Sequence, residues 1–236
     1  MPSAPDRRSG RRPLVGDERG QYGACRSLLR TDGPEFWAEP VNALSNAAFL
    51  LAAFLAWRRW GKDPLCAALA MVLGVIGIGS FLFHTLATSW AAAADVLPIL
   101  GFILLYVWAA QRRFWGQGRL VSGLLTAATL PWIAALAPVF AALPGFRISA
   151  VYWPVPLLIL IHAGLLYRRR PALAQGLAAG AGILCLSLVF RSLDGVLCGA
   201  VPMGTHVLWH LLNALMLGWM IELLGRHGVA APASRR

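Results

Sequence analysis

The sequence predicts an all-α membrane protein: a bundle of seven transmembrane helices with the N-terminus outside and the C-terminus in the cytoplasm. Of the 236 residues, 58% are hydrophobic and the mean hydropathy is +0.63, whereas roughly 45 to 50% apolar residues is usual for a soluble domain. Most of the apolar residues gather in long segments, and a helix needs about 20 such residues to cross the hydrocarbon core of a bilayer.

Five of these segments approach the full crossing length, and two are shorter or interrupted by polar groups. The crossings are predicted at residues 40–57, 65–87, 93–111, 120–142, 148–167, 172–190 and 202–224. Short loops leave no room for a second domain, so residues 22–224 form one transmembrane domain. The tail 1–21 is polar and predicted to be disordered, and it lacks the apolar run of a signal peptide. Residues 225–236 form a short basic tail.

The formal net charge of +11 does not indicate nucleic-acid binding, because the basic residues lie in loops between apolar segments. One set of loops holds Arg58, Arg59, Lys62, Arg112, Arg113, Arg119, Arg168, Arg169, Arg170, Arg226, Arg235 and Arg236. The loops of the other side hold only Arg147 and Arg191, apart from the arginines of the N-terminal tail. Since basic residues concentrate in cytoplasmic loops, the first set is predicted to be cytoplasmic.

Polar side chains inside the apolar segments are few, and each costs free energy, about 2.5 to 3.5 kcal/mol for Asp or Arg near the bilayer centre. They are Glu39, Asn42, Ser45, Asn46, Ser80, His84, Asp95, Arg191, Asp194, His206, His210 and Asn213. Successive helices run in opposite directions, so the end of the second, the start of the third and the start of the seventh lie toward one face. By the charge distribution, that face is the outer one.

The spacing of the histidines predicts a metal site at this face. His206 and His210 are four residues apart, which puts both imidazoles on one side of a helix. Ser80 and His84 have the same spacing on another helix. Three histidines and a water would form the open tetrahedral site of a catalytic zinc. Asp95, which follows His84 by 11 residues, is close enough in the chain to fold over the open position.

Simpler structural roles compete with this interpretation for single residues. Ser80 could bond back to a carbonyl of its own helix, and Asp95 could be the N-cap of the third helix. Arg191 and Asp194, placed just after the sixth helix, are interpreted as a structural ion pair that joins the sixth and seventh helices. Glu39, Asn42 and Asn46 are treated as structural polar residues of the first helix.

Two other cofactor classes fit the sequence less well. Haem needs two histidines on facing helices, which leaves the third histidine, Ser80 and Asp95 without a role. A retinal protein needs a lysine inside the bundle, and Lys62, the only lysine, lies in a predicted loop.

The four cysteines show no CxxC spacing and so do not indicate a zinc ribbon. Cys25 and Cys198 both face outside in the predicted topology, which permits a disulfide. Cys66 and Cys185 fall within predicted helices and are interpreted as packing residues.

Three stretches resemble the alkaline ceramidase family of membrane amide hydrolases, which is related to the adiponectin receptors and haemolysin III-like proteins. They are EPVNALSNAAF at 39–49, GIGSFLFHTLATSWAAAADVLPIL at 77–100 and RSLDGVLCGAVPMGTHVLWHLLNA at 191–214. The specific element is the combined pattern of Ser and His four apart, an Asp 11 residues later, and a His pair four apart near the C-terminus. The resemblance extends over 22–224 and implies that this segment is a hydrolase domain.

The resemblance implies zinc as cofactor, with His84, His206 and His210 as its ligands. It implies that Asp95 deprotonates the zinc-bound water and that Ser80 stabilises the oxyanion. The expected reaction cleaves an N-acyl lipid of ceramide type, bound within the bilayer, into a fatty acid and a sphingoid base. Two alternatives stay open: a different N-acyl lipid as substrate, or a receptor-like haemolysin III-type protein with a structural metal.

The N-terminal region departs from the pattern of the eukaryotic members, which bind calcium there. If Cys25 is the equivalent cysteine, Gly23 and Arg26 stand where acidic ligands are expected, and Glu39 alone cannot supply the several oxygens that calcium needs. The calcium site is therefore predicted to be absent. In those relatives the cysteine pairs with one before the last helix, which implies a bond between Cys25 and Cys198.

The predicted location is the cytoplasmic membrane of a bacterium, with the site toward the outer face. Arginine supplies all but one of the 21 basic residues and the chain is rich in alanine, as is typical of GC-rich bacterial genomes. The sequence gives no indication of the oligomeric state.

Overall fold

A computed structural model of the protein describes residues 39–197, 200–201 and 204–228, and every regular element in these residues is helical. The helices are α2 (Pro40–Ser45), α3 (Ala47–Trp60), α4 (Pro64–Leu86), α5 (Ser89–Arg113), α6 (Arg119–Ala141), η1 (Arg147–Ser149), α7 (Pro154–Leu166), α8 (Pro171–Leu197) and α9 (His206–Gly228). The all-α fold class is confirmed. The predictions for the N-terminal tail, the calcium region, the C-terminal residues after 228 and the Cys25–Cys198 disulfide fall outside the described residues.

Within the described residues, six helical segments are long and apolar enough to cross a membrane, so the protein is an integral, multi-pass membrane protein. The first of them, Pro40–Trp60, consists of α2 and α3 together. The predicted crossing at 148–167 has a different form, because the 3-10 turn η1 precedes a helix α7 of only 13 residues. At 1.5 Å per residue α7 is about 20 Å long, short of a bilayer core of about 30 Å.

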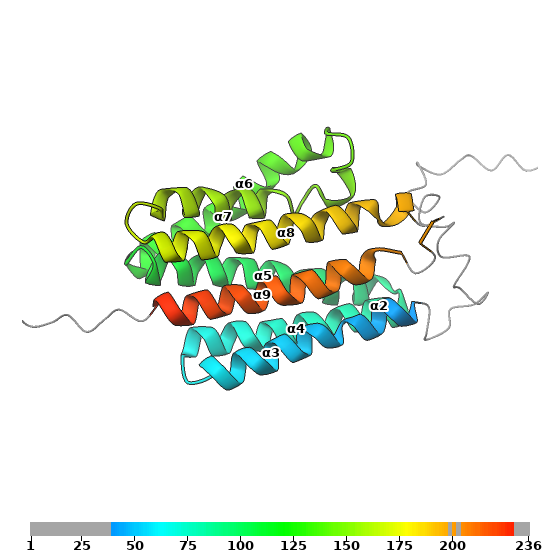
Figure 1. Cartoon of the computed structure of the whole chain (residues 1–236), viewed down its shortest axis with the longest axis horizontal. Coiled ribbons are helices and arrows are strands. Elements are labelled where there is room, and N and C mark those ends of the chain that lie inside the picture. Colours follow the sequence, from blue (N-terminus) through cyan, green and yellow to red (C-terminus); the bar gives the residue numbers. More distant parts are fainter. Residues whose placement is uncertain (1–38, 198–199, 202–203, 229–236) are drawn as a thin grey trace, which may run out of the picture.

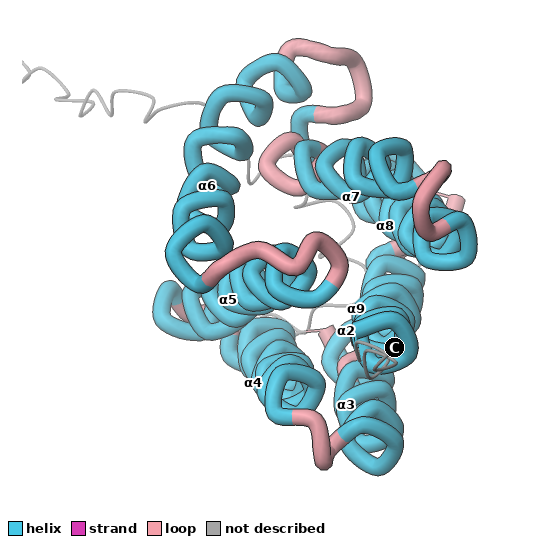
Figure 2. Tube along the Cα trace, turned by 90° about the vertical axis from the view of Figure 1, so that its left-hand side faces the viewer, coloured by secondary structure: helices cyan, strands magenta, loops and turns pink. Residues whose placement is uncertain are grey.

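The helices pack as a closed ring. Each helix from α3 to α9 contacts the next, and α9 packs against α3 to close the ring. Figures 1 and 2 show the bundle from the side and along its axis, with α9 running beside α8 and α3. Because α9 also contacts α2, α4 and α5, it has the most neighbours of any helix in the described part of the chain. Residues on α9 are therefore well placed to form a site with several other helices.

Helix α6 lies at the periphery of the ring. Only Ser122 and Thr129 of α6 are buried, whereas large apolar side chains such as Leu120 and Leu124 are exposed. Exposed leucines would be unfavourable in water but match a lipid environment, where apolar surface has no hydration cost.

Two glycines allow α4 to pack closely between its neighbours near its C-terminal end. A Cβ atom at Gly79 would collide with the carbonyl oxygen of Ala94 on α5, and one at Gly77 would lie 2.9 Å from the Cβ of Phe49 on α3. Both contacts need a residue without a side chain. They bring the last two turns of α4, which carry Ser80 and His84, against the helices on either side.

Candidate metal and catalytic site

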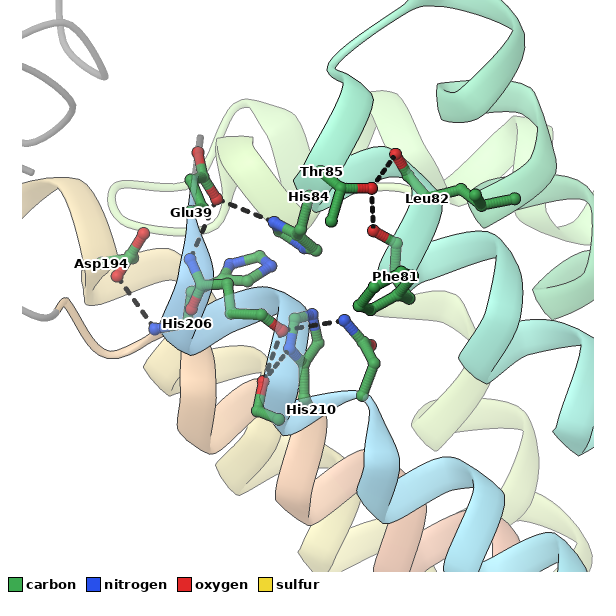
Figure 3. Close-up of polar contacts among 11 residues, drawn as sticks. Glu39, Phe81, Leu82, His84, Thr85, Asp194, His206 and His210 are labelled. Atoms are coloured by element: carbon green, nitrogen blue, oxygen red, sulfur yellow. Dashed lines mark hydrogen bonds and ion pairs between the residues drawn. The ribbon is translucent and has the colours of Figure 1, made fainter. Parts of the chain in front are cut away.

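Three histidines from two helices meet at one end of the bundle. His84 lies in the last turn of α4, and His206 and His210 occupy the first two turns of α9. One potential ligand atom from each lies within 4.8 Å of the others, and their ring centroids are 4.7 to 5.1 Å apart. Figure 3 shows the three imidazoles turned toward a common point. The predicted cluster is therefore present as a group that can hold a metal ion.

The start of α9 is fixed by a carboxylate from α8. Oδ1 of Asp194 accepts hydrogen bonds from the backbone N–H groups of Thr205 (2.6 Å) and His206 (2.9 Å). These are two of the amides that the first turn of a helix leaves without an internal partner. The cap holds the first turn of α9, and with it the position of His206, against the end of α8 (Figure 3).

The chain around α2 orients two of the three imidazoles. Nδ1 of His84 lies 2.7 Å from Oε2 of Glu39, and Nδ1 of His210 lies 2.6 Å from Oγ of Ser45. The Ser45 hydroxyl donates its proton to the carbonyl oxygen of Asn42 at 2.7 Å, so its oxygen accepts from the Nδ1–H of His210. An ionised Glu39 only accepts and therefore receives the Nδ1–H of His84.

These hydrogen bonds set the tautomers that metal binding requires. With Nδ1 protonated, Nε2 of His84 and of His210 carries a lone pair, the form in which imidazole binds a metal. Nε2 of His84 is buried and has no hydrogen-bond partner. An orphaned buried nitrogen costs about 1 to 3 kcal/mol, and a metal ion would satisfy it. Three imidazoles suit zinc, as well as copper, iron or nickel, so the residues fit a zinc ion.

Ser80 and Asp95 lie beside the histidines. They line the same cavity as His210. The alternative that Asp95 caps the third helix is wrong, because α5 begins at Ser89 and its cap is the Thr88 side chain, which accepts from the N–H of Ala91. Asp95 therefore sits inside the helix, facing the bundle interior.

The predicted ion pair between Arg191 and Asp194 is wrong. Both residues lie within α8, which continues to Leu197, and each has its own partners. Arg191 donates to the carbonyl oxygen of Ile148 at 2.6 Å, and its guanidinium packs over the rings of Tyr152 and Trp209 at 5.2 and 5.3 Å. Asp194 does join the sixth and seventh predicted helices, but through the backbone amides of α9.

The remaining polar residues of the first helix support the histidines. Asn42 donates to Oε2 of Glu39 at 3.0 Å, and the buried Asn46 donates to the carbonyl oxygen of Asn42 at 2.8 Å. The contacts of Glu39 and Ser45 with the histidines were not predicted. A signal was present, because the polar residues from 39 to 46 recur every three or four positions and so share a helix face.

An apolar cavity extends from the site into the bundle. Besides Ser80, Asp95 and His210, it is lined by residues such as Ile99, Ile103, Tyr152, Leu184 and Trp209. An apolar cavity with a few polar groups at one end is typical of a small-molecule or lipid site.

An all-helical membrane protein with a metal-binding group of three histidines at the head of an apolar cavity is the class that the fold and the site define. The family model described as Ceramidase matches residues 34–226, and the chain belongs to this family. Membership supports hydrolysis of ceramide, an amide, as the general function. No curated protein matches the chain.

Proposed function

We propose that the protein is a zinc-dependent intramembrane amidase that cleaves an N-acyl lipid of ceramide type into a fatty acid and a sphingoid base. The observation that carries the proposal is the convergence of three histidines, with a buried and unpartnered Nε2 on His84, next to Asp95 at the head of an apolar cavity. Family membership supports the amide as the bond that is cleaved.

His84, His206 and His210 would hold the zinc ion through one ring nitrogen each. Zinc in such a site lowers the pKa of a bound water to about 7 and so supplies hydroxide at neutral pH. Glu39 and Ser45 hold the rings of His84 and His210 in the required orientation through their Nδ1 atoms. Such supporting hydrogen bonds also raise the basicity of the ligands.

Asp95 and Ser80 have separate roles in this proposal. The Asp95 carboxylate would accept a proton from the attacking water at an Oδ atom and deliver it to the nitrogen of the leaving amine as the amide C–N bond breaks, acting as a general base and then a general acid. The Ser80 hydroxyl would donate a hydrogen bond to the substrate carbonyl oxygen as negative charge develops on it. The cavity would take an alkyl chain of the substrate and exclude water.

The position of the site suits a lipid whose amide lies at the depth of the headgroups. All the site residues lie at one end of the bundle, where α4 ends and α5 and α9 begin. The distribution of arginines favours the outer face for this end, and the arginine-rich and alanine-rich composition favours a bacterial cytoplasmic membrane.

Fatty acid release tests the proposal. Purified protein with one equivalent of zinc is incubated with ceramides and with N-acyl lipids that lack a sphingoid base, and the products are measured by mass spectrometry. Release from ceramide that is absent in the Asp95→Asn variant supports the proposal. Release only from the N-acyl lipids without a sphingoid base would identify one of them, and not ceramide, as the substrate. No release from any of the lipids would exclude the amidase function.

A further inference from the structure

A second cavity adjoins the cavity below the site. Four residues line both cavities: Ile103, Val155, Met216 and Leu217. Taken together, the two cavities form a path from the site toward the opposite end of the bundle. Residues of α5, α7, α8 and α9 line both parts or one of them, α3 and α4 add residues near the site, and no residue of α6 lines either part.

One face of α5 follows the whole path. Its lining residues are Asp95, Ile99, Phe102, Ile103, Tyr106, Val107 and Ala110, followed by the C-cap residue Phe114, and they form two adjacent rows with a spacing of three or four residues. From Asp95 to Ala110 the helix rises about 22 Å at 1.5 Å per residue. An extended alkyl chain advances about 1.25 Å per carbon, so this path holds roughly 16 to 18 carbons.

The far end of the path is lined by residues that have fixed partners. Phe114 is 7% exposed, and the guanidinium of Arg170 packs over its ring at 5.7 Å and donates to the carbonyl oxygen of His227 at 2.6 Å. His162 lines the same cavity and pairs with the buried Gln111 through its Nε2 at 3.1 Å. We call Ala110, Phe114 and His162 the floor of the cavity.

Given the proposed function, on which this step rests, we propose that the floor sets the length of the acyl chain that the enzyme accepts, with an optimum near 16 to 18 carbons. The acyl half of the substrate fits this path better than the base half. The walls turn apolar at Ile99, one turn below Asp95, whereas a sphingoid base carries hydroxyl groups next to the amide nitrogen that would be buried there without partners.

Two substitutions at the floor should change the length of the cavity in opposite directions. Ala110→Leu adds a branched side chain at the end of the path and should shorten the optimum by roughly two to four carbons, whereas Phe114→Ala removes a ring and should lengthen it by a similar amount. Gly101→Leu is the matched control, because Gly101 is on the same helix but exposed, with open space where a side chain would start.

The measurement is equilibrium binding of saturated fatty acids of 8 to 22 carbons to each purified, full-length protein, with ceramide hydrolysis by acyl length in parallel. Opposite shifts of the binding optimum in the two floor variants, with no shift in Gly101→Leu, support the inference. If only one of the two variants folds, the shift of its binding optimum alone tests the inference. An unchanged optimum overturns the inference even if ceramide is hydrolysed, whereas shifted binding without any hydrolysis supports the floor as the limit of the bound chain but overturns the proposed amidase function.

Discussion

The two ends of the bundle use polar side chains in different ways. We call the end with His84, His206 and His210 the histidine end, and the end with Asp63, Arg113 and Glu222 the arginine end. At the arginine end, Asp63 accepts two hydrogen bonds from Arg113 at 2.6 and 2.8 Å, and Glu222 accepts from the Trp60 ring at 2.6 Å and pairs with Arg59 at 3.0 Å.

The two ends therefore differ in role: the arginine end stabilises the fold, whereas the histidine end carries the candidate site. Acidic groups at the arginine end meet basic partners on other helices and so tie α3, α4, α5 and α9 together. At the histidine end the basic ring nitrogens converge on one another, and one of them, Nε2 of His84, has no partner. A buried ring nitrogen that lacks a hydrogen-bond partner and faces two other imidazoles fits a metal ligand better than a contribution to folding.

Removal of one ligand should have the largest effect. His210→Ala takes away one of three zinc-binding nitrogens, and we expect the zinc content to fall from about one per chain to near zero and hydrolysis to fall below detection. His227→Ala is the matched control, because His227 is on the same helix at the arginine end. Metal analysis of both purified variants checks this, and a full zinc content in His210→Ala would exclude His210 as a ligand.

Asp95→Asn should separate metal binding from turnover. The amide has nearly the same shape as the carboxylate but cannot accept the proton, so we expect zinc to stay bound while turnover falls about 10²- to 10⁴-fold. Zinc content and the rate of fatty acid release are measured on the same preparation. Wild-type turnover in this variant would remove Asp95 from the mechanism.

Glu39→Gln should weaken the metal site without abolishing it. The amide oxygen can still accept the Nδ1–H of His84 but without a negative charge, so we expect the zinc affinity to fall about 10- to 100-fold. Competition with a chelator gives the affinity of each protein. An unchanged affinity would mean that Glu39 does not support His84.

The smallest effect on activity is expected at the arginine end. Arg113→Met breaks a largely buried ion pair and should lower the free energy of unfolding by about 2 kcal/mol, with turnover per folded molecule unchanged. Burial alone would raise the pKa of Asp63, but Arg113 and the N–H groups of Cys66 and Leu65 hold it below its ordinary value of 3.8. The stabilisation is therefore present above pH 4 and lost as the pH falls through the lowered pKa.

Denaturation of the wild type and of Arg113→Met at several acid pH values tests the predicted loss of this stabilisation. The stability difference between wild type and Arg113→Met should shrink as the pH falls below about 4. A difference that grows at acid pH, or a loss of turnover in the folded variant, would contradict the assignment of the arginine end to stability alone.

Local rules predicted most of the fold from the sequence. Long apolar runs predicted seven crossings; six of them are helices long enough to span a membrane in the described residues, and several of their ends were predicted within a few residues. Errors of four or more residues occur at some helix ends. The third span was predicted to begin at 93, but α5 begins four residues earlier, at Ser89, with Thr88 as its N-cap. The sixth was predicted to stop at 190, before Arg191, yet α8 continues because Arg191 packs on Tyr152 and Trp209.

The three histidines could be predicted because their spacing and the alternation of helix direction place them at one face. Their supporting partners could not. Glu39 contacts a histidine 45 residues away, and Ser45 contacts one 165 residues away, and no rule of local spacing connects positions so distant. The close packing at Gly77 and Gly79 that makes these contacts possible depends likewise on which helices are neighbours.

The central claim is that amide hydrolysis depends on one metal ion held by the three histidines. The most direct test is to strip the purified protein with a chelator and to follow fatty acid release from ceramide as zinc is added back. The claim predicts no release from the stripped protein and a linear rise that ends at one zinc per chain, with no recovery in His210→Ala. Full activity in metal-free protein, or recovery in His210→Ala, would contradict it.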